Sequence, residues 1–228
     1  MSRPEAQPRR SPALRMALPL AALAGALLAG TPAAAAQIAF SGWTLQKFSL
    51  FSKVDFGQQG AVLTIDAQDA ASLLWTAVPA SDRGRGSAAW DWSVARSVPA
   101  TDLTRKGGDD RNAAVYFVFL PEAQAAAAAG GSIASLLSNE AARVLVYTWG
   151  GAHRRGEMLA SPYLGPRGRT VVLRPAGTGR HSEKVSLAKD YAAAFGGAPG
   201  ALVGVAVSAD SDDTDGVIAA QVSGLRLD

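Results

Sequence analysis

Aspartates gather at two places in this sequence, and carboxylate groups in such clusters can bind a cation or take part in acid–base chemistry. Asp109 and Asp110 stand in the segment KGGDDRN, directly before an apolar run. The segment SADSDDTDG follows another apolar run and adds Asp210, Asp212, Asp213 and Asp215. In antiparallel neighbouring strands, the start of one strand and the end of the other share an edge of the sheet. If the two apolar runs form neighbouring strands of this kind, the two acidic segments lie close together.

Like charges held close together need a cation, a basic partner or raised pKa values. Calcium is the candidate cation, because it takes carboxylate and carbonyl oxygens from flexible loops. The candidate metal ligands are Asp110, Asp213 and Asp215, although DSDDTDG departs from the spacing of a calcium loop and lacks a distal glutamate. The alternative is that Asp, Gly and Ser in both segments simply form turns. In that case Gly107 and Gly108 allow a tight turn before the strand.

Tryptophans near such acids would suit a sugar ligand. Trp90 and Trp92 are two residues apart, so on a strand both point to one face. If exposed, they offer a platform on which sugar rings can stack; if buried, they are core side chains, as large aromatics in sandwiches usually are. Trp149 stands beside two glycines at a strand end, and we expect it to be partly exposed. The predicted ligand-binding residues are Asp109, Asp110, Trp92, Trp149, Asp210 and Asp213.

Glycoside hydrolysis is a second use of paired carboxylates, and it requires two carboxyl groups roughly 5–9.5 Å apart across a cleft. Asp110 with either Glu183 or Asp213 is the candidate pair. The sequence has no Gly-x-Ser-x-Gly elbow, no phosphate-binding glycine loop and no dinucleotide fingerprint. With no cysteine and only two histidines, it also lacks the residues for thiolate chemistry, iron–sulfur sites and three-histidine metal centres.

Residues 150–169 form a basic segment that contains four arginines and a single acidic residue, Glu157. An up-and-down path of the strands places it at the same end of the sheet as Asp109 and Asp110. It could pair with these acids or bind an anionic glycan, and the alternative is a solvated hairpin loop. Its arginines are Arg154, Arg155, Arg167 and Arg169.

The first 36 residues have the three-part pattern of a secretory signal peptide. Arginines precede the apolar run MALPLAALAGALLAG, and Ala36 ends a small-residue segment suited to cleavage. A transmembrane anchor is disfavoured, because a spanning helix needs roughly 20 apolar residues. We expect a periplasmic or secreted protein with one domain, residues 37–228. Without the signal, 18 basic and 18 acidic side chains remain, so the basic footprint of a nucleic-acid-binding protein is missing.

Short runs of β-type composition, separated by turn-forming residues, predict about nine strands. The pattern favours an all-β fold, an antiparallel sandwich of jelly-roll type. An alanine-rich insertion, residues 121–140, predicts a short helix or a mobile flap, and residues 187–197 predict one short helix. The predicted strands are residues 60–67, 72–79, 88–96, 113–120, 142–150, 169–176, 183–188, 201–209 and 216–227.

The chain resembles a bacterial family known as domain of unknown function 3047. The resemblance rests on WDWSV, KGGDDRNAAVYFVF, VLVYTWGG, EKVSLAKDYAAAFG and VAVSADSDDTDG, which occur in this order. It covers the chain from Trp43 to the C-terminus. It implies an exported, β-rich protein and transfers no chemistry. The residues themselves favour a non-catalytic module that binds a glycan or another envelope ligand, with a polysaccharide hydrolase as the alternative.

Overall fold

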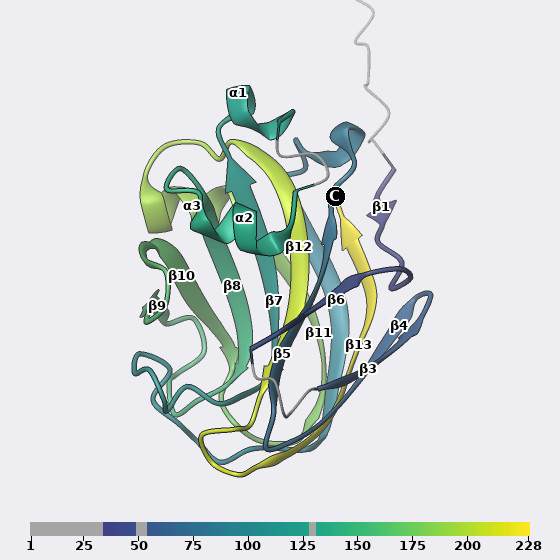
Figure 1. Cartoon of the computed structure of the whole chain (residues 1–228), viewed down its shortest axis with the longest axis vertical. Helices are drawn as coiled ribbons and strands as arrows, with labels where there is room; N and C mark the ends of the chain where they lie inside the picture. Colours follow the sequence, from purple (N-terminus) through teal and green to yellow (C-terminus); the bar gives the residue numbers. More distant parts are fainter. Residues whose placement is uncertain (1–33, 49–53, 128–130) are drawn as a thin grey trace, which may run out of the picture. The chain divides into compact units, whose positions relative to one another are not determined.

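The computed structural model describes residues 34–48, 54–127 and 131–228 (Figure 1). The predicted signal peptide lies outside the described residues except for its last three positions, and so do residues 128–130 of the alanine-rich insertion. Among the described residues, no helix combines the length and apolar character needed to cross a membrane.

The described residues form two β-sheets, and the first has six strands, all paired antiparallel. It is called the six-stranded sheet below. Its order is β11 (Gly179–Ser186), β6 (Ser87–Arg96), β13 (Val217–Leu227), β4 (Val62–Gln68) and β3 (Asp55–Gln59), with the short β1 (Ala36–Gln37) paired to β13.

The second sheet, the seven-stranded sheet, carries the acidic segments at one edge of its central strands. All its pairings are antiparallel except that of β8 with β10, which is parallel. After β8 the chain forms the edge strand β9, and then turns back to form β10 between β8 and β9. Its order is β2 (Thr44–Lys47), β5 (Ala71–Ala77), β12 (Ala201–Asp210), β7 (Arg111–Leu120), β8 (Arg143–Gly150), β10 (Gly165–Arg174) and β9 (Met158–Ser161).

The predicted β-sandwich is confirmed, and the nine predicted strands correspond to β4–β8 and β10–β13. The strands that were not predicted, β1, β2, β3 and β9, are two to five residues long. Alternation along β4 places Leu63 and Ile65 in the core while Asp66 is exposed, as expected for a strand with one buried face.

The main core lies between the two sheets, where side chains of both pack together. A second apolar cluster covers the outer face of the seven-stranded sheet beneath α1 (Glu122–Ala125) and α2 (Ile133–Ser138), which form within the predicted insertion. Because both of its faces are covered, every residue of β12 is buried. In Figure 1, α1 and α2 lie toward one end of the strands, and the β12–β13 turn lies at the opposite end.

The predicted short helix near Tyr191 is α3 (Leu187–Phe195). The Ser186 hydroxyl accepts the backbone N–H of Lys189 at its start, and Gly196 ends it with a φ of +80°. The Tyr191 ring packs 5.0 Å from Phe195 and 5.2 Å from Phe119, centroid to centroid. A single 3₁₀ turn, η1 (Ala80–Asp82), completes the helical segments of the described ranges.

Candidate functional site

The two acidic segments meet at one edge of the seven-stranded sheet, because the condition stated above, antiparallel pairing of their two strands, is met. β7 and β12 are antiparallel neighbours, and Arg111 at the start of β7 pairs with Asp210 at the end of β12. The segment before β7 and the turn after β12 are therefore adjacent. Gly107 adopts a φ of +67°, the left-handed conformation that glycine tolerates and that the predicted tight turn requires.

Asp110 joins the two segments. Its side chain is fully buried, and its carboxylate accepts the backbone N–H groups of Asp213 at 3.2 Å and Thr214 at 2.9 Å, together with the Thr214 hydroxyl. In return, the backbone N–H of Asp109 donates to Oδ2 of Asp213 at 3.3 Å. Asp110 therefore holds the turn after β12 in place, a long-range structural role that neither of the two interpretations of the sequence included.

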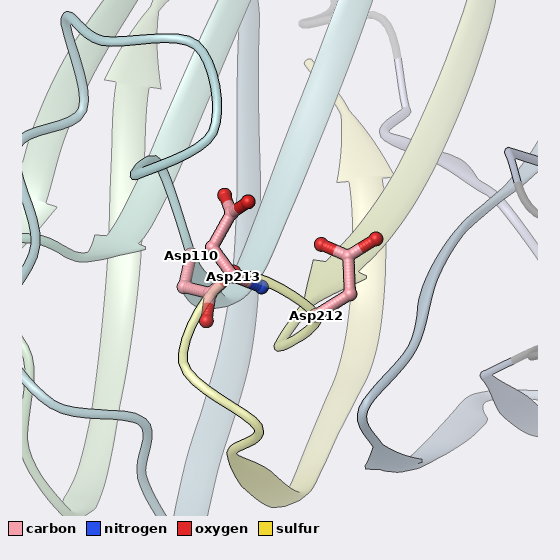
Figure 2. Close-up of side chains that lie close together, drawn as sticks. All are labelled: Asp110, Asp212 and Asp213. Atoms are coloured by element: carbon pink, nitrogen blue, oxygen red, sulfur yellow. The ribbon is translucent and has the colours of Figure 1, made fainter.

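Three carboxylates of this edge could hold a metal ion. One oxygen each of Asp110, Asp212 and Asp213 lies within 4.8 Å of the others, and Figure 2 shows these side chains together. Burial, and then the neighbouring Asp110 and Asp212, raise the pKa of Asp213. Asp215, one of the predicted ligands, is not in this group. It occupies a turn position with a φ of +49°, and Asp212 takes its place.

A pocket of about 370 Å³ opens beside this edge, on the outer face of the seven-stranded sheet. Its floor is formed by Tyr116, Val146 and Thr170, which lie side by side in register on β7, β8 and β10. Leu137 of α2 and Leu164 of the β9–β10 turn add apolar walls. The volume falls within the range of small-ligand sites, roughly 300–1,000 Å³.

The polar end of the pocket is organised by Arg111. Its Nη1 lies 2.7 Å from Oδ2 of Asp109 and 3.3 Å from Oδ2 of Asp210. Its Nη2 donates to the Tyr116 hydroxyl at 3.1 Å, and this hydroxyl lies 3.0 Å from that of Ser208. The guanidinium is thus committed to acceptors of the protein itself.

Asp210 is the least satisfied of these acids. It is 8% exposed, and its Oδ1 has no hydrogen-bond partner among the described residues. Burial raises the pKa of Asp210 from 3.8 to about 8; Arg111 opposes the rise, and the Asp212 carboxyl adds to it. Asp210 is therefore largely protonated at neutral pH.

Two exposed aromatic rings line the pocket. Phe48 is 59% exposed and Tyr163 is 58% exposed. The Tyr163 hydroxyl donates to Oδ1 of Asp109 at 2.9 Å, which ties the ring to the acidic edge, and Lys106 lies 5.6 Å from the ring centroid. Partial burial, and then this hydrogen bond, raise the pKa of Tyr163 to about 12. The ring is thus held neutral and in place at the mouth of the pocket.

The predicted tryptophan platform does not form, because all three indoles are buried. Trp92 packs edge-on against Trp90 and Trp149 at 5.5 Å between centroids, inside the sandwich. The expectation that Trp149 is partly exposed is wrong: it is 1% exposed, because it faces the six-stranded sheet and the His181 ring covers it at 5.0 Å. Trp92 and Trp149 are therefore out of reach of a ligand in the pocket.

Glu183, the other proposed catalytic acid, is a buried member of an ion-pair group. Its carboxylate accepts Trp92 Nε1 at 3.2 Å, Arg174 Nε at 2.8 Å and Arg155 Nη2 at 3.2 Å. It lies on β11 of the six-stranded sheet and is not part of the pocket lining. Its contacts account for its burial without a ligand.

Three of the four arginines of residues 150–169, namely Arg155, Arg167 and Arg169, have other partners than the two acids proposed for them. Arg167 donates to the carbonyls of Leu137 and Asn139, and Arg169 donates to carbonyls of its own turn. Within the described ranges, the arginine that pairs with Asp109 is Arg111, which the sequence analysis did not single out. Tyr163 and Phe48 were not singled out either.

Comparison with known proteins identifies a family and two distant folds. A family model described as "Protein of unknown function (DUF3047)" matches residues 41–226, whereas no curated protein matches the sequence. A thermostable cellulase derived from Cel12A of Rhodothermus marinus covers 84% of this chain and 98% of its own, at 10% identity and a TM-score of 0.41. An endo-1,4-beta-xylanase from Trichoderma reesei covers 79% and 96%, at 9% identity and a TM-score of 0.37. Similarity at this level carries no argument about activity.

Proposed function

The chain belongs to the family described as "Protein of unknown function (DUF3047)", and we propose that it is a non-catalytic module of the cell envelope that binds a glycan in the pocket beside its acidic edge. The observation that carries this proposal is the combination of apolar walls, exposed rings of Phe48 and Tyr163, and carboxyl groups at one end. A sugar ring has an apolar face that packs on aromatic side chains and hydroxyls that donate to carboxylates.

The position of Arg111 between two of the acids favours binding over hydrolysis. Asp109 and Asp210 both contact Nη1 of Arg111, so a guanidinium occupies the space where a glycosidase would hold the scissile bond. The carboxylate of Asp110 is occupied by the backbone of the turn after β12. The acid pairs proposed from the sequence, Asp110 with Glu183 or Asp213, therefore lack a free carboxylate at Asp110.

Export is part of the proposal, and it is supported by the three-part pattern of the first 36 residues. Gln37 pairs with Arg226 on β13, so cleavage after Ala36 would leave the first mature residue within the sheet. A periplasmic or extracellular location would bring the pocket into contact with envelope glycans. N-terminal sequencing of exported protein should begin at Gln37, and material that retains Met1 would contradict cleavage.

Isothermal titration with soluble hexasaccharides of glucose, xylose, glucosamine and N-acetylglucosamine should reveal binding of at least one of them. Tyr163→Ala should weaken that binding about 3- to 10-fold, because an aromatic contact of this kind contributes roughly 0.5–1.5 kcal/mol. Leu45→Ala is the matched control: Leu45 is 38% exposed and lies outside the pocket lining.

Two outcomes would contradict this proposal. If none of the hexasaccharides binds at millimolar concentration, glycan binding fails. If chromatography detects shorter sugars after incubation, and Asp210→Asn abolishes their release, the hydrolase alternative replaces the binding module.

We also propose that calcium is the cation of the Asp110, Asp212 and Asp213 group, since oxygen ligands from a turn suit it. Asp212 and Asp213 would be its main ligands, and Oδ1 of Asp110, which accepts a single hydrogen bond, would be the third. Calcium at a hundred times its dissociation constant would add about 2.7 kcal/mol to the free energy of unfolding. Calcium should therefore raise the melting temperature and EDTA should reverse the rise. Asp213→Asn should reduce the response, whereas Asp215→Asn should preserve it, since asparagine tolerates a positive φ. An unchanged melting curve of the wild type in calcium would remove the metal from the proposal.

A further inference from the structure

The charges at the polar end of the pocket are unbalanced. Four aspartates line this end, and Arg111 is the basic residue among the lining residues. Because Nη1 of Arg111 contacts Asp109 and Asp210 and Nη2 donates to Tyr116, the positive charge of Arg111 is already held by acids of the protein. Asp212 and Asp213 are exposed there. An anionic ligand would therefore meet repulsion, and a cationic one would meet attraction.

Asp210 gives a second, independent sign that a ligand group is missing at this end of the pocket. It lines the same end of the pocket, is 8% exposed, and has an Oδ1 without a hydrogen-bond partner among the described residues. Buried carboxyl oxygens are nearly always paired, because leaving one unpaired is costly. A cation with N–H donors beside Asp212 and Asp213 would supply a donor for this oxygen and favour the ionised form of Asp210.

We infer that the glycan bound in this pocket carries a protonated amine, an amino sugar whose ammonium group lies at the acidic end among Asp210, Asp212 and Asp213. The inference rests on the proposed function, because Tyr163 and Phe48 supply the surface for the sugar ring. An ammonium group is compact and has three N–H donors, so two exposed carboxylates can bind it together. The amine distinguishes this ligand from a neutral glycan of the same shape.

Three β-1,4-linked hexasaccharides provide the test, because those of glucose, N-acetylglucosamine and glucosamine differ at carbon 2. This carbon bears a hydroxyl, an acetamide or an ammonium group, respectively. Titrations at pH 6 in EDTA should give the glucosamine hexamer an affinity about tenfold or more above that of the glucose hexamer, as hydrogen bonds to charged groups are the stronger kind. Added calcium should weaken the binding of the glucosamine hexamer and should not weaken that of the other two hexamers.

Variants separate the role of the charges from that of the fold. Asp212→Asn and Asp213→Asn should each lower the affinity for the glucosamine hexamer several-fold more than the affinity for the glucose hexamer, because an ammonium group loses an ionic partner and a hydroxyl loses a neutral one. Asp66→Asn is the matched control, since it removes an exposed carboxylate of β4 in the other sheet and should leave the preference intact. Hexalysine should not compete, because it lacks a sugar ring.

The possible results distinguish failure of the amino-sugar inference from failure of glycan binding itself. If the glucose and glucosamine hexamers bind equally, the amino-sugar inference fails while glycan binding stands. If none of the three binds, the proposed function fails with it. If hexalysine competes as well as the glucosamine hexamer, the site recognises positive charge alone, and the inference of an amino sugar is overturned.

Discussion

Replacing Arg111 by methionine should lower the free energy of unfolding by about 3–5 kcal/mol, the usual cost of removing one partner of a buried ion pair. Asp109 is 3% exposed and would keep a buried carboxylate with the Tyr163 hydroxyl as its remaining side-chain donor. Methionine is similar to arginine in length and has no charge, so the expected loss is mainly electrostatic. Urea unfolding at pH 7, extrapolated linearly to water, measures it.

A matched control and a second substitution make this result specific. Arg226→Met removes an exposed guanidinium 3.8 Å from Asp228 and should cost no more than about 1 kcal/mol, as for most surface pairs. Adding Asp109→Asn to the Arg111→Met variant should recover part of the loss, because the buried charge is then gone. If Arg111→Met alone lowers the free energy of unfolding by less than about 1 kcal/mol, the ion pair with Arg111 is not needed to keep the Asp109 carboxylate buried.

The strands that form the core could be predicted because their local composition, rich in apolar residues, indicates that they are buried. β7 and β12 are apolar on both faces, and the structure covers both faces of each. The edge strands were missed for the opposite reason: β2, TLQK, and β3, DFGQQ, are short and largely polar, so they form by pairing with a longer neighbour. The parallel pairing of β8 with β10 depends on where the chain returns, which composition does not encode.

The convergence of the acidic segments could be predicted only on the condition that their two strands pair antiparallel, and it is the structure that shows this pairing, of β7 with β12. The side chains that pair with these acids could not be predicted. Arg111 stands at a register irregularity between β7 and β8, so the direction of its side chain depends on a neighbouring strand. Tyr163 comes from the β9–β10 turn, 54 residues along the chain from Asp109. Trp149 was misplaced because its exposure depends on which face of β8 meets the other sheet.

The second large effect concerns pH. The folded-state pKa of Asp210 is about 8, against an ordinary value of 3.8, so between these two pH values the folded protein keeps a proton that the unfolded chain has released. Stability from this group is therefore greatest at low pH and is lost as the pH rises toward 8, by about 1.4 kcal/mol per pH unit within the window. Asparagine resembles the protonated side chain and does not ionise.

Asp210→Asn should therefore become more stable relative to the wild type as the pH rises, by roughly 4 kcal/mol between pH 5 and pH 9. Denaturant unfolding of both proteins in EDTA at pH 5, 7 and 9 measures the difference, and EDTA removes any contribution from a metal. Asp66→Asn, at an exposed position of β4, should show no such trend. A difference that stays constant with pH, or changes in the opposite direction, would mean that Asp210 is ionised in the folded protein. Arg111 would then neutralise both Asp109 and Asp210, and Asp210 would be a second anionic partner of the guanidinium instead of a buried acid.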